Sequence, residues 1–198
     1  MKTPKFNALK TTSQVSLSLL LLLQVACGQT SKKQETNVTS NHTTTVVAPA
    51  MDIQAAILSD QLAVVEQHIK SGTDINKKDA MSGATPLITA ASFGKLKITK
   101  ALIDAGVDLN LKNNDGATAL HTAAFFGRIE IVQLLIDAKA DTTIKNNFGA
   151  NPRESVLAPF NDMKPVYEML QQQLAPMGMQ IDLKEIEKAR PVIAMMLQ

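Results

Sequence analysis

The stretch that decides the fold is 83–112, GATPLITAASFGKLKITKALIDAGVDLNLK, because a second version of it, GATALHTAAFFGRIEIVQLLIDAKADTTIK, follows at 116–145. The two versions open at Gly83 and Gly116, and a third glycine follows at Gly149. The spacing is therefore 33 residues, as 116 minus 83 and 149 minus 116. Self-similarity at such a period is typical of stacked-repeat architectures.

Each version predicts a short helix followed by a longer one. Thr85 and Thr118 are suited to cap the first helix, and Pro86 fits its first turn, where a missing N–H costs nothing. Gly94 and Gly127 end it. Between them, two alanine pairs keep the helix thin enough for a neighbouring repeat: Ala90 with Ala91, and Ala123 with Ala124.

The second helix of each version shows an apolar stripe at helical spacing. Gly106 is suited to end the first of these helices in the left-handed conformation. Lys139 takes that place in the next version, which predicts strain or a different cap. The polar residues 113–116 then predict a turn into the next unit. The stripe residues are Leu96, Ile98, Leu102 and Ile103 in one version and Ile129, Ile131, Val132, Leu135 and Ile136 in the other.

These motifs resemble the ankyrin repeat. The signature T-P-L-x-x-A-A stands at 85–91, T-A-L-H-x-A-A at 118–124 and A-G-x-D-x-N at 105–110. The resemblance covers about residues 51–157 and implies an all-α ankyrin-repeat solenoid with β-hairpin-like loops. It does not identify a partner, because one fold serves many functions.

The chain divides into a leader, a linker, an array and a C-terminal cap. We expect a signal peptide at 1–26, a lipid-anchored flexible linker at 27–50, the array at 51–157 and a helical cap at 158–198. The predicted repeats span about 51–79, 80–112 and 113–145, with a partial unit from 146.

The terminal units depart from the repeat pattern, as the outer units of such arrays do. The first lacks the Thr-Pro opening and has His68 where the others have Leu102 and Leu135, which predicts a packed histidine rather than a ligand. In the last unit, helices are expected over 152–158 and 163–174.

A final helix is predicted from Asp182 toward Leu197. Asp182 and Glu185 have the spacing of a capping box. Pro191 is expected to kink or split this helix. The methionines of the C-terminal segment either fill the core of the cap or form an adaptable docking surface.

The amino terminus is laid out as a secretory leader, with three lysines, an apolar run at 15–23 and then small residues. Residues 25–28, Val-Ala-Cys-Gly, resemble the lipobox of bacterial lipoproteins, which implies lipidation of Cys27. Gln24 departs from that motif, and cleavage after Gly28 to give a soluble periplasmic protein is the alternative. Cys27 is the only cysteine, so no disulfide accounts for it.

The polar segment 29–49 is too poor in apolar residues to fold and predicts a flexible tether. Of the 20 basic residues, three belong to the leader, and the remaining 17 face 18 acidic residues, a formal net charge of −1. Charge therefore gives no reason to expect nucleic acid or an anionic membrane as a partner. The membrane is expected to be reached only through the lipid anchor.

No set of residues predicts catalysis. The three histidines are His42 in the tether, His68, and His121, for which the resemblance implies a structural hydrogen bond between loops. Metal-ligand spacings, phosphate loops and nucleophile elbows are absent from the sequence. We therefore expect a protein that is not an enzyme and has no cofactor or metal.

The resemblance implies that the hairpin tips and the ends of the first helices contact a protein partner. Four of the six phenylalanines fall at these positions, and aromatic side chains dominate interface energetics. Phe93 and Phe126 have an equally good alternative as packing residues. The predicted partner-binding residues are Met81, Ser82, Ser92, Phe93, Lys112, Asn114, Asp115, Phe125, Phe126, Lys145, Asn147 and Phe148.

The resulting functional hypothesis is a monomeric protein–protein interaction module of the bacterial cell envelope, facing the periplasm from the outer membrane. Its partner is expected on the concave face formed by the tips and the first helices. Two alternatives are an inhibitor or immunity protein against a secreted toxin and a stabilising scaffold for a periplasmic enzyme.

Overall fold

A computed structural model describes residues 48–198, and every regular element in that range is a helix. The predicted leader lies outside the described residues, as does all of the predicted linker except residues 48–50. The helices are α1 (Ile53–Leu58), α2 (Leu62–Lys70), α3 (Pro86–Ser92), α4 (Leu96–Asp104), α5 (Ala119–Phe125), α6 (Ile129–Asp137), α7 (Glu154–Leu157), α8 (Phe160–Leu174), the 3-10 helix η1 (Ala175–Met177) and α9 (Leu183–Met196).

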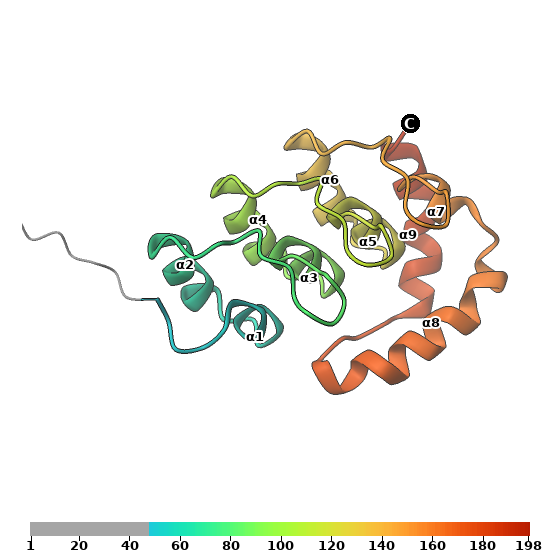
Figure 1. Ribbon diagram of the computed structural model, residues 1–198. Coiled ribbons are helices and arrows are strands. Elements are labelled where there is room, and N and C mark those ends of the chain that lie inside the picture. The colour runs from blue at the N-terminus through green and yellow to red at the C-terminus, as the bar shows by residue number, and fades with distance from the viewer. Residues whose placement is uncertain (1–47) are drawn as a thin grey trace, which may run out of the picture. The chain divides into compact units, whose positions relative to one another are not determined.

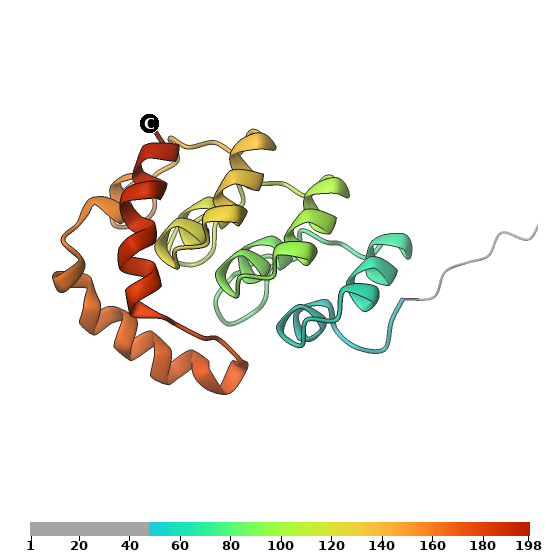
Figure 2. The same ribbon diagram turned by 180° about the vertical axis from the view of Figure 1, so that it is seen from behind.

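The first six helices form three stacked pairs. The inner helices α1, α3 and α5 pack side by side, and the outer helices α2, α4 and α6 form a parallel row (Figures 1 and 2). Each pair contacts only its neighbours, as expected for a solenoid. The all-α repeat architecture predicted from the sequence is confirmed.

Side chains cap the inner helices where the sequence predicted. The hydroxyl oxygens of Thr85 and Thr118 accept hydrogen bonds from the third residue of their helices. The first repeat lacks this threonine, and there Asp52 is the N-cap residue: its carboxylate accepts hydrogen bonds from the backbone N–H groups of Gln54 and Ala55. The unusual first repeat therefore keeps the cap with a different residue.

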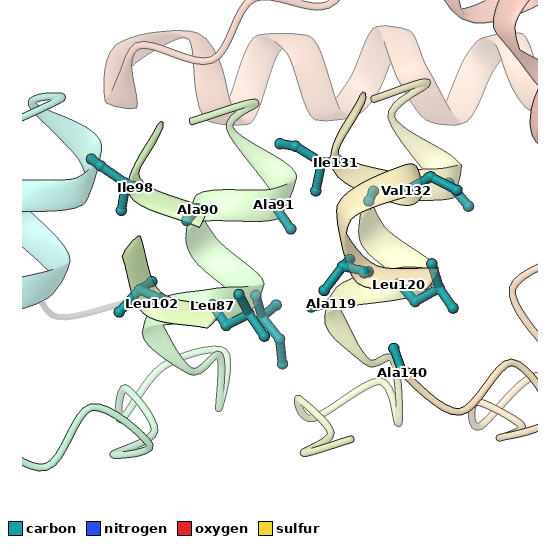
Figure 3. Packing of buried hydrophobic residues seen from close by; sticks show 14 of the residues in the cluster. Leu87, Ala90, Ala91, Ile98, Leu102, Ala119, Leu120, Ile131, Val132 and Ala140 are labelled. Carbon is teal, nitrogen blue, oxygen red and sulfur yellow. The ribbon is translucent and has the colours of Figure 1, made fainter. Parts of the chain in front are cut away.

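Small residues on the inner helices let the repeats approach closely. Ala90 and Ala91 are fully buried, as are their counterparts Ala123 and Ala124. Larger side chains such as Leu87 and Leu120 fill the space between pairs (Figure 3). The resulting core runs without interruption through all three pairs.

The apolar stripe of α4 differs from the prediction at two positions. Leu96 is 42% exposed, because it lies at a surface groove between α4 and α6 rather than in the core. Thr99 is buried instead, at the position of Val132 in the next repeat. Its hydroxyl oxygen has no hydrogen-bond partner within the described part of the chain, an unfavourable arrangement in an apolar core.

Residue Lys139 ends α6 with a φ of 69°, in the left-handed region. Gly106 occupies the same place after α4 with a φ of 79°. A lysine in this conformation costs roughly 1–2 kcal/mol. Of the two outcomes expected from the sequence, strain rather than a different cap is observed.

The C-terminal helices differ in their bounds from the expected ones. The helix expected at 152–158 is only the four residues of α7, and α8 begins at Phe160 rather than at 163. α9 continues through Pro191, so the helix is not split. Asp182 caps α9, but the reciprocal half of the capping box is not formed, because the carboxylate of Glu185 accepts from Lys188 instead.

Helix α9 covers the end of the array, where it packs against α5, α6 and α7. Ala189, Ile193 and Leu197 belong to the same core as the repeats. At Gly127 the approach is close enough that an added Cβ would lie 3.2 Å from the Cα atom of Ile186. Because Gly127 has no side chain, α9 can pack directly on the end of α5.

The hairpin tips are joined to one another by backbone hydrogen bonds. The N–H of Asn114 donates to the carbonyl of Ser82 at 2.9 Å, and that of Asn147 donates to the carbonyl of Asp115 at 2.9 Å. This contact leaves no room for a side chain at Gly116, where an added Cβ would lie 2.4 Å from Oδ1 of Asn147 and 2.8 Å from its backbone nitrogen.

Replacing Gly116 with alanine is expected to be more destabilising than replacing Gly149. Both glycines have a positive φ, so each alanine incurs roughly 1–2 kcal/mol of backbone strain. Only Gly116 adds an overlap with the next tip, which is expected to add about 1–3 kcal/mol. Urea unfolding of both variants measures the difference, and equal free energies of unfolding would contradict the packing described here.

Candidate protein-binding face

Three hairpin tips, at residues 79–84, 113–117 and 146–150, form one edge of the array. Each is closed by the side chain of its first residue, which accepts backbone N–H groups further along the tip. Asp79 does this with both carboxylate oxygens, and Asn113 and Asn146 do it with Oδ1. The tips are thus held both internally and to one another, which fixes the positions of the side chains they carry.

Most of the predicted partner-binding residues lie exposed on this edge. Two large apolar side chains are almost fully in water, Met81 at 92% exposed and Phe148 at 82%. They belong to the first and third tips, and the polar pair Asn114 and Asp115 stands between them. The exposed predicted residues are Met81, Ser82, Lys112, Asn114, Asp115, Lys145, Asn147 and Phe148.

Several of these polar side chains also hold the tips together. Nδ2 of Asn114 donates to the carbonyl of Met81 at 3.0 Å, and that of Asn147 donates to the carbonyl of Asn114 at 2.9 Å. Nζ of Lys112 donates to the carbonyl of Lys145 at 2.9 Å. Their substitution would therefore change the scaffold as well as the surface.

The aromatic residues at the ends of the inner helices are placed differently from the prediction. Phe126 is only 8% exposed and Phe93 and Phe125 are half-buried; all three belong to one apolar cluster with residues of the chain's own C-terminal segment. A partner cannot reach Phe126 while this segment is in place. Ser92 is also half-buried, and its hydroxyl donates to the carbonyl of Ile88 at 2.8 Å.

The covering segment includes α8, which runs below the row of inner helices in both views (Figures 1 and 2). Met179, Ile181 and Ile186, which follow α8 in the chain, belong to the same cluster. Tyr167 at its middle is fully buried, with its ring centroid 4.6 Å from that of Phe125. Its hydroxyl donates to the carbonyl of Phe125 at 2.8 Å. The phenylalanine side chains thus have packing partners within the same molecule.

Residue Arg190 supports this contact from α9. Its buried guanidinium donates to the hydroxyl of Tyr167 at 3.1 Å and to the carbonyl of Ala158 just before α8. No carboxylate of the described residues forms an ion pair with it. Neither Tyr167 nor Arg190 belongs to the repeat pattern, so neither was predicted as a functional residue from the sequence.

Residue His121 links α5 to the next tip. Nε2 donates to the carbonyl of Ala150 at 3.1 Å, and Nδ1 accepts from the backbone N–H of Thr118 at 3.2 Å. These partners require a neutral ring with its proton on Nε2. Gln54 of the first repeat makes the equivalent bond, from Nε2 to the carbonyl of Ala84 at 3.2 Å, a role that the sequence analysis missed.

The environment of His121 disfavours its charged form. Burial lowers the pKa of His121; the hydrogen bond to Ala150 opposes this shift, and the charge of Lys112 adds to it. Protonation of Nδ1 would also set a second donor against the N–H of Thr118. The folded protein therefore takes up this proton at a lower pH than the unfolded chain does.

We expect His121→Gln to remove one part of the protein's pH dependence. Below the unfolded pKa of about 6.5, the unfolded state binds more protons at His121, so wild-type stability falls by up to about 1.4 kcal/mol per pH unit. Glutamine keeps a donor for Ala150, as Gln54 does in the first repeat, but does not titrate. Urea unfolding between pH 8 and pH 5 tests this, and parallel curves for the two proteins would contradict it.

Comparison with known proteins agrees with this geometry. The family model described as ankyrin repeats (3 copies) matches residues 53–146. This segment is an ankyrin repeat domain. Its three matched copies correspond to the three helix pairs α1–α2, α3–α4 and α5–α6.

Among solved structures, 447 chains match, and one of them is the ankyrin repeat domain of Bcl-3, described as a unique member of the IkappaB protein family. The match has 28% sequence identity and a TM-score of 0.51. It covers 52% of this chain and 45% of that chain, so the ankyrin array spans less than half of the length of that protein chain. No curated protein matches.

Ankyrin repeats are in general protein–protein interaction scaffolds. Among the described residues, no three His, Cys, Asp or Glu side chains are grouped closely enough to hold a metal ion. Within the described range, none of the helices is long and apolar enough to cross a membrane.

Proposed function

We propose that this ankyrin repeat protein binds another protein through its row of hairpin tips, without catalysis. The observation that carries the proposal is the exposure of Met81 and Phe148, two large apolar side chains at the ends of that row. Isolated apolar residues on a surface are common, but these two stand on the first and third tips of one row, two residues before Gly83 and one residue before Gly149.

The tips are well suited to hold such anchors. Each tip is closed by its own Asp or Asn side chain and bonded to the next one. The backbone of the tips therefore has little conformational entropy left to lose on binding, and such a loss is a main cost of forming an interface. The polar residues between the anchors, such as Asn114 and Asp115, supply hydrogen-bonding groups around them.

The double variant Met81→Ser and Phe148→Ser is expected to lose capture of the partner. Removing a hot-spot anchor costs about 2 kcal/mol or more, so affinity should fall roughly 30-fold if one of the two residues is such an anchor and roughly 1,000-fold if both are. Crosslinking in the producing cell, followed by affinity capture and mass spectrometry, compares the variant with wild type. Both side chains lie in water, so the fold should be unaffected.

A matched control is Met169→Ser together with Met195→Ser. These methionines are also exposed but lie on α8 and α9, away from the tips. Capture by the control and not by the tip variant supports the proposal. Equal capture by wild type and tip variant would rule out the tip row as the binding site.

We further propose that the protein acts in the bacterial cell envelope, anchored by a lipid at Cys27. The support is sequence alone: a lysine-rich start, the apolar run at 15–23 and the lipobox-like residues 25–28. The predicted linker would then separate the repeats from the membrane surface. A partner in the periplasm follows from this location.

Expression in a bacterial host with radiolabelled palmitate tests the anchor. Wild type is expected to carry the label and to sediment with membranes, and Cys27→Ser should lose both properties. Gln24→Leu brings the segment closer to the lipobox and should increase the labelled fraction. A soluble, unlabelled wild-type protein that begins after Gly28 would show that the alternative cleavage is used.

A further inference from the structure

Helix α8 has the pattern of a ligand helix. Its apolar residues are spaced alternately by three and four, so they line one face. Tyr167 is at the centre of this face, and Glu168 and Met169 lie on the opposite, exposed side. The residues of the apolar face are Phe160, Met163, Tyr167, Leu170 and Leu174.

The apolar face of α8 packs in a cluster of its own. That cluster contains Phe93, Phe125 and Phe126 from the array, together with apolar residues of α8 and of the segment that leads into α9. The main core contains residues of the three helix pairs, α7 and α9, but none from α8. The main core of the array and of α9 is therefore built without α8, and α9 meets α8 through Ile186 and Arg190.

The polar attachments of α8 to the array are few. Tyr167 supplies the hydrogen bond to the carbonyl of Phe125, and Arg190 reinforces it from α9. No ion pair among residues 48–198 joins α8 to the array. Side-chain packing on three phenylalanines thus provides most of the attachment.

Irregular backbone separates α8, together with η1 after it, from α7 and α9. Before it, Ala158 and Pro159 are extended, with ψ of 148° and 133°. After it, Gly178 has a φ of 84°, and residues 179–182 lead to α9 without regular structure. Rotation in these two segments would move α8 while α7 and α9 stay in the core.

We propose that Phe93, Phe125 and Phe126 form a helix-binding site, and that α8 is its internal, displaceable occupant. The external ligand is an amphipathic helix of the partner with the same alternating spacing and a tyrosine at the eighth position. This is the helix-in-groove mode of recognition. The inference rests on the proposed function in that the partner is a protein, but it uses different residues.

The tip row and the phenylalanine site that α8 covers lie at opposite ends of the inner helices. α3 begins just after the first tip and ends next to Phe93, and a helix of seven residues is roughly 10 Å long. One partner can therefore contact both. Contacts at the open tips would raise the effective concentration of the partner helix, which it needs to compete with a tethered α8.

The test uses a fluorescent peptide of residues 159–176 as the probe and the full chain as the receptor. Tyr167→Ala in the chain should release its own α8, so the peptide should bind this variant at least tenfold more tightly than wild type. Glu168→Ala changes the neighbouring exposed residue of the same helix and should bind like wild type. Adding Phe125→Ala to Tyr167→Ala should abolish binding.

Equal affinity for wild type and Tyr167→Ala, or no binding to either, would overturn the proposal. Hydrogen exchange on the unmodified chain gives a second measurement that does not depend on a variant folding. Amides in α8 should be protected at least a hundredfold less than those in α5, because α8 opens alone. Equal protection would show that α8 is an integral part of the fold.

These measurements involve no native partner and no tip residue. Failure of the peptide to bind would therefore leave the proposed tip interface intact. Conversely, a tip variant that still captures its partner would leave the helix-binding site untouched.

Discussion

Close contact between successive repeats is the constraint on which the structure depends. A helix pair of this size cannot bury its apolar face alone, and stacking supplies the missing partner surface. Fully buried alanines on the inner helices allow the pairs to approach, and hydrogen bonds between tips fix their spacing at the other edge. The exposed row of tips is thus a direct product of the interaction that stabilises the fold.

The sequence predicted the repeated part well because each of its features has a local physical cause. Thr85, Thr118 and Gly106 act within a single turn of helix, so their roles can be inferred without knowledge of the rest of the fold. The role of Gln54 could not be inferred from the sequence, because only the fold shows that it donates to the carbonyl of Ala84 as His121 donates to that of Ala150. Periodicity alone equated Leu96 with a buried residue, but in the fold this side chain lies at the surface groove between α4 and α6.

The candidate site was predicted in part, and the reason for the remainder is long-range packing. Exposure of Met81 and Phe148 agrees with their expected places at the tips. Phe126 also has its expected place in the repeat, yet it is covered by a segment more than 30 residues further along the chain. No repeat motif describes that segment, so its docking through Tyr167 and Arg190 was not inferred from the sequence.

The position of α9 also has a consequence for how the protein folds. The helix that completes the core follows all the repeats in the chain, and Ile193 and Ala194 are among its buried residues. Until α9 has docked, the repeats expose the apolar side of α5 and α6 that it covers. Transiently exposed apolar surface makes a chain prone to association, so the docking of α9 is the folding step that removes this surface.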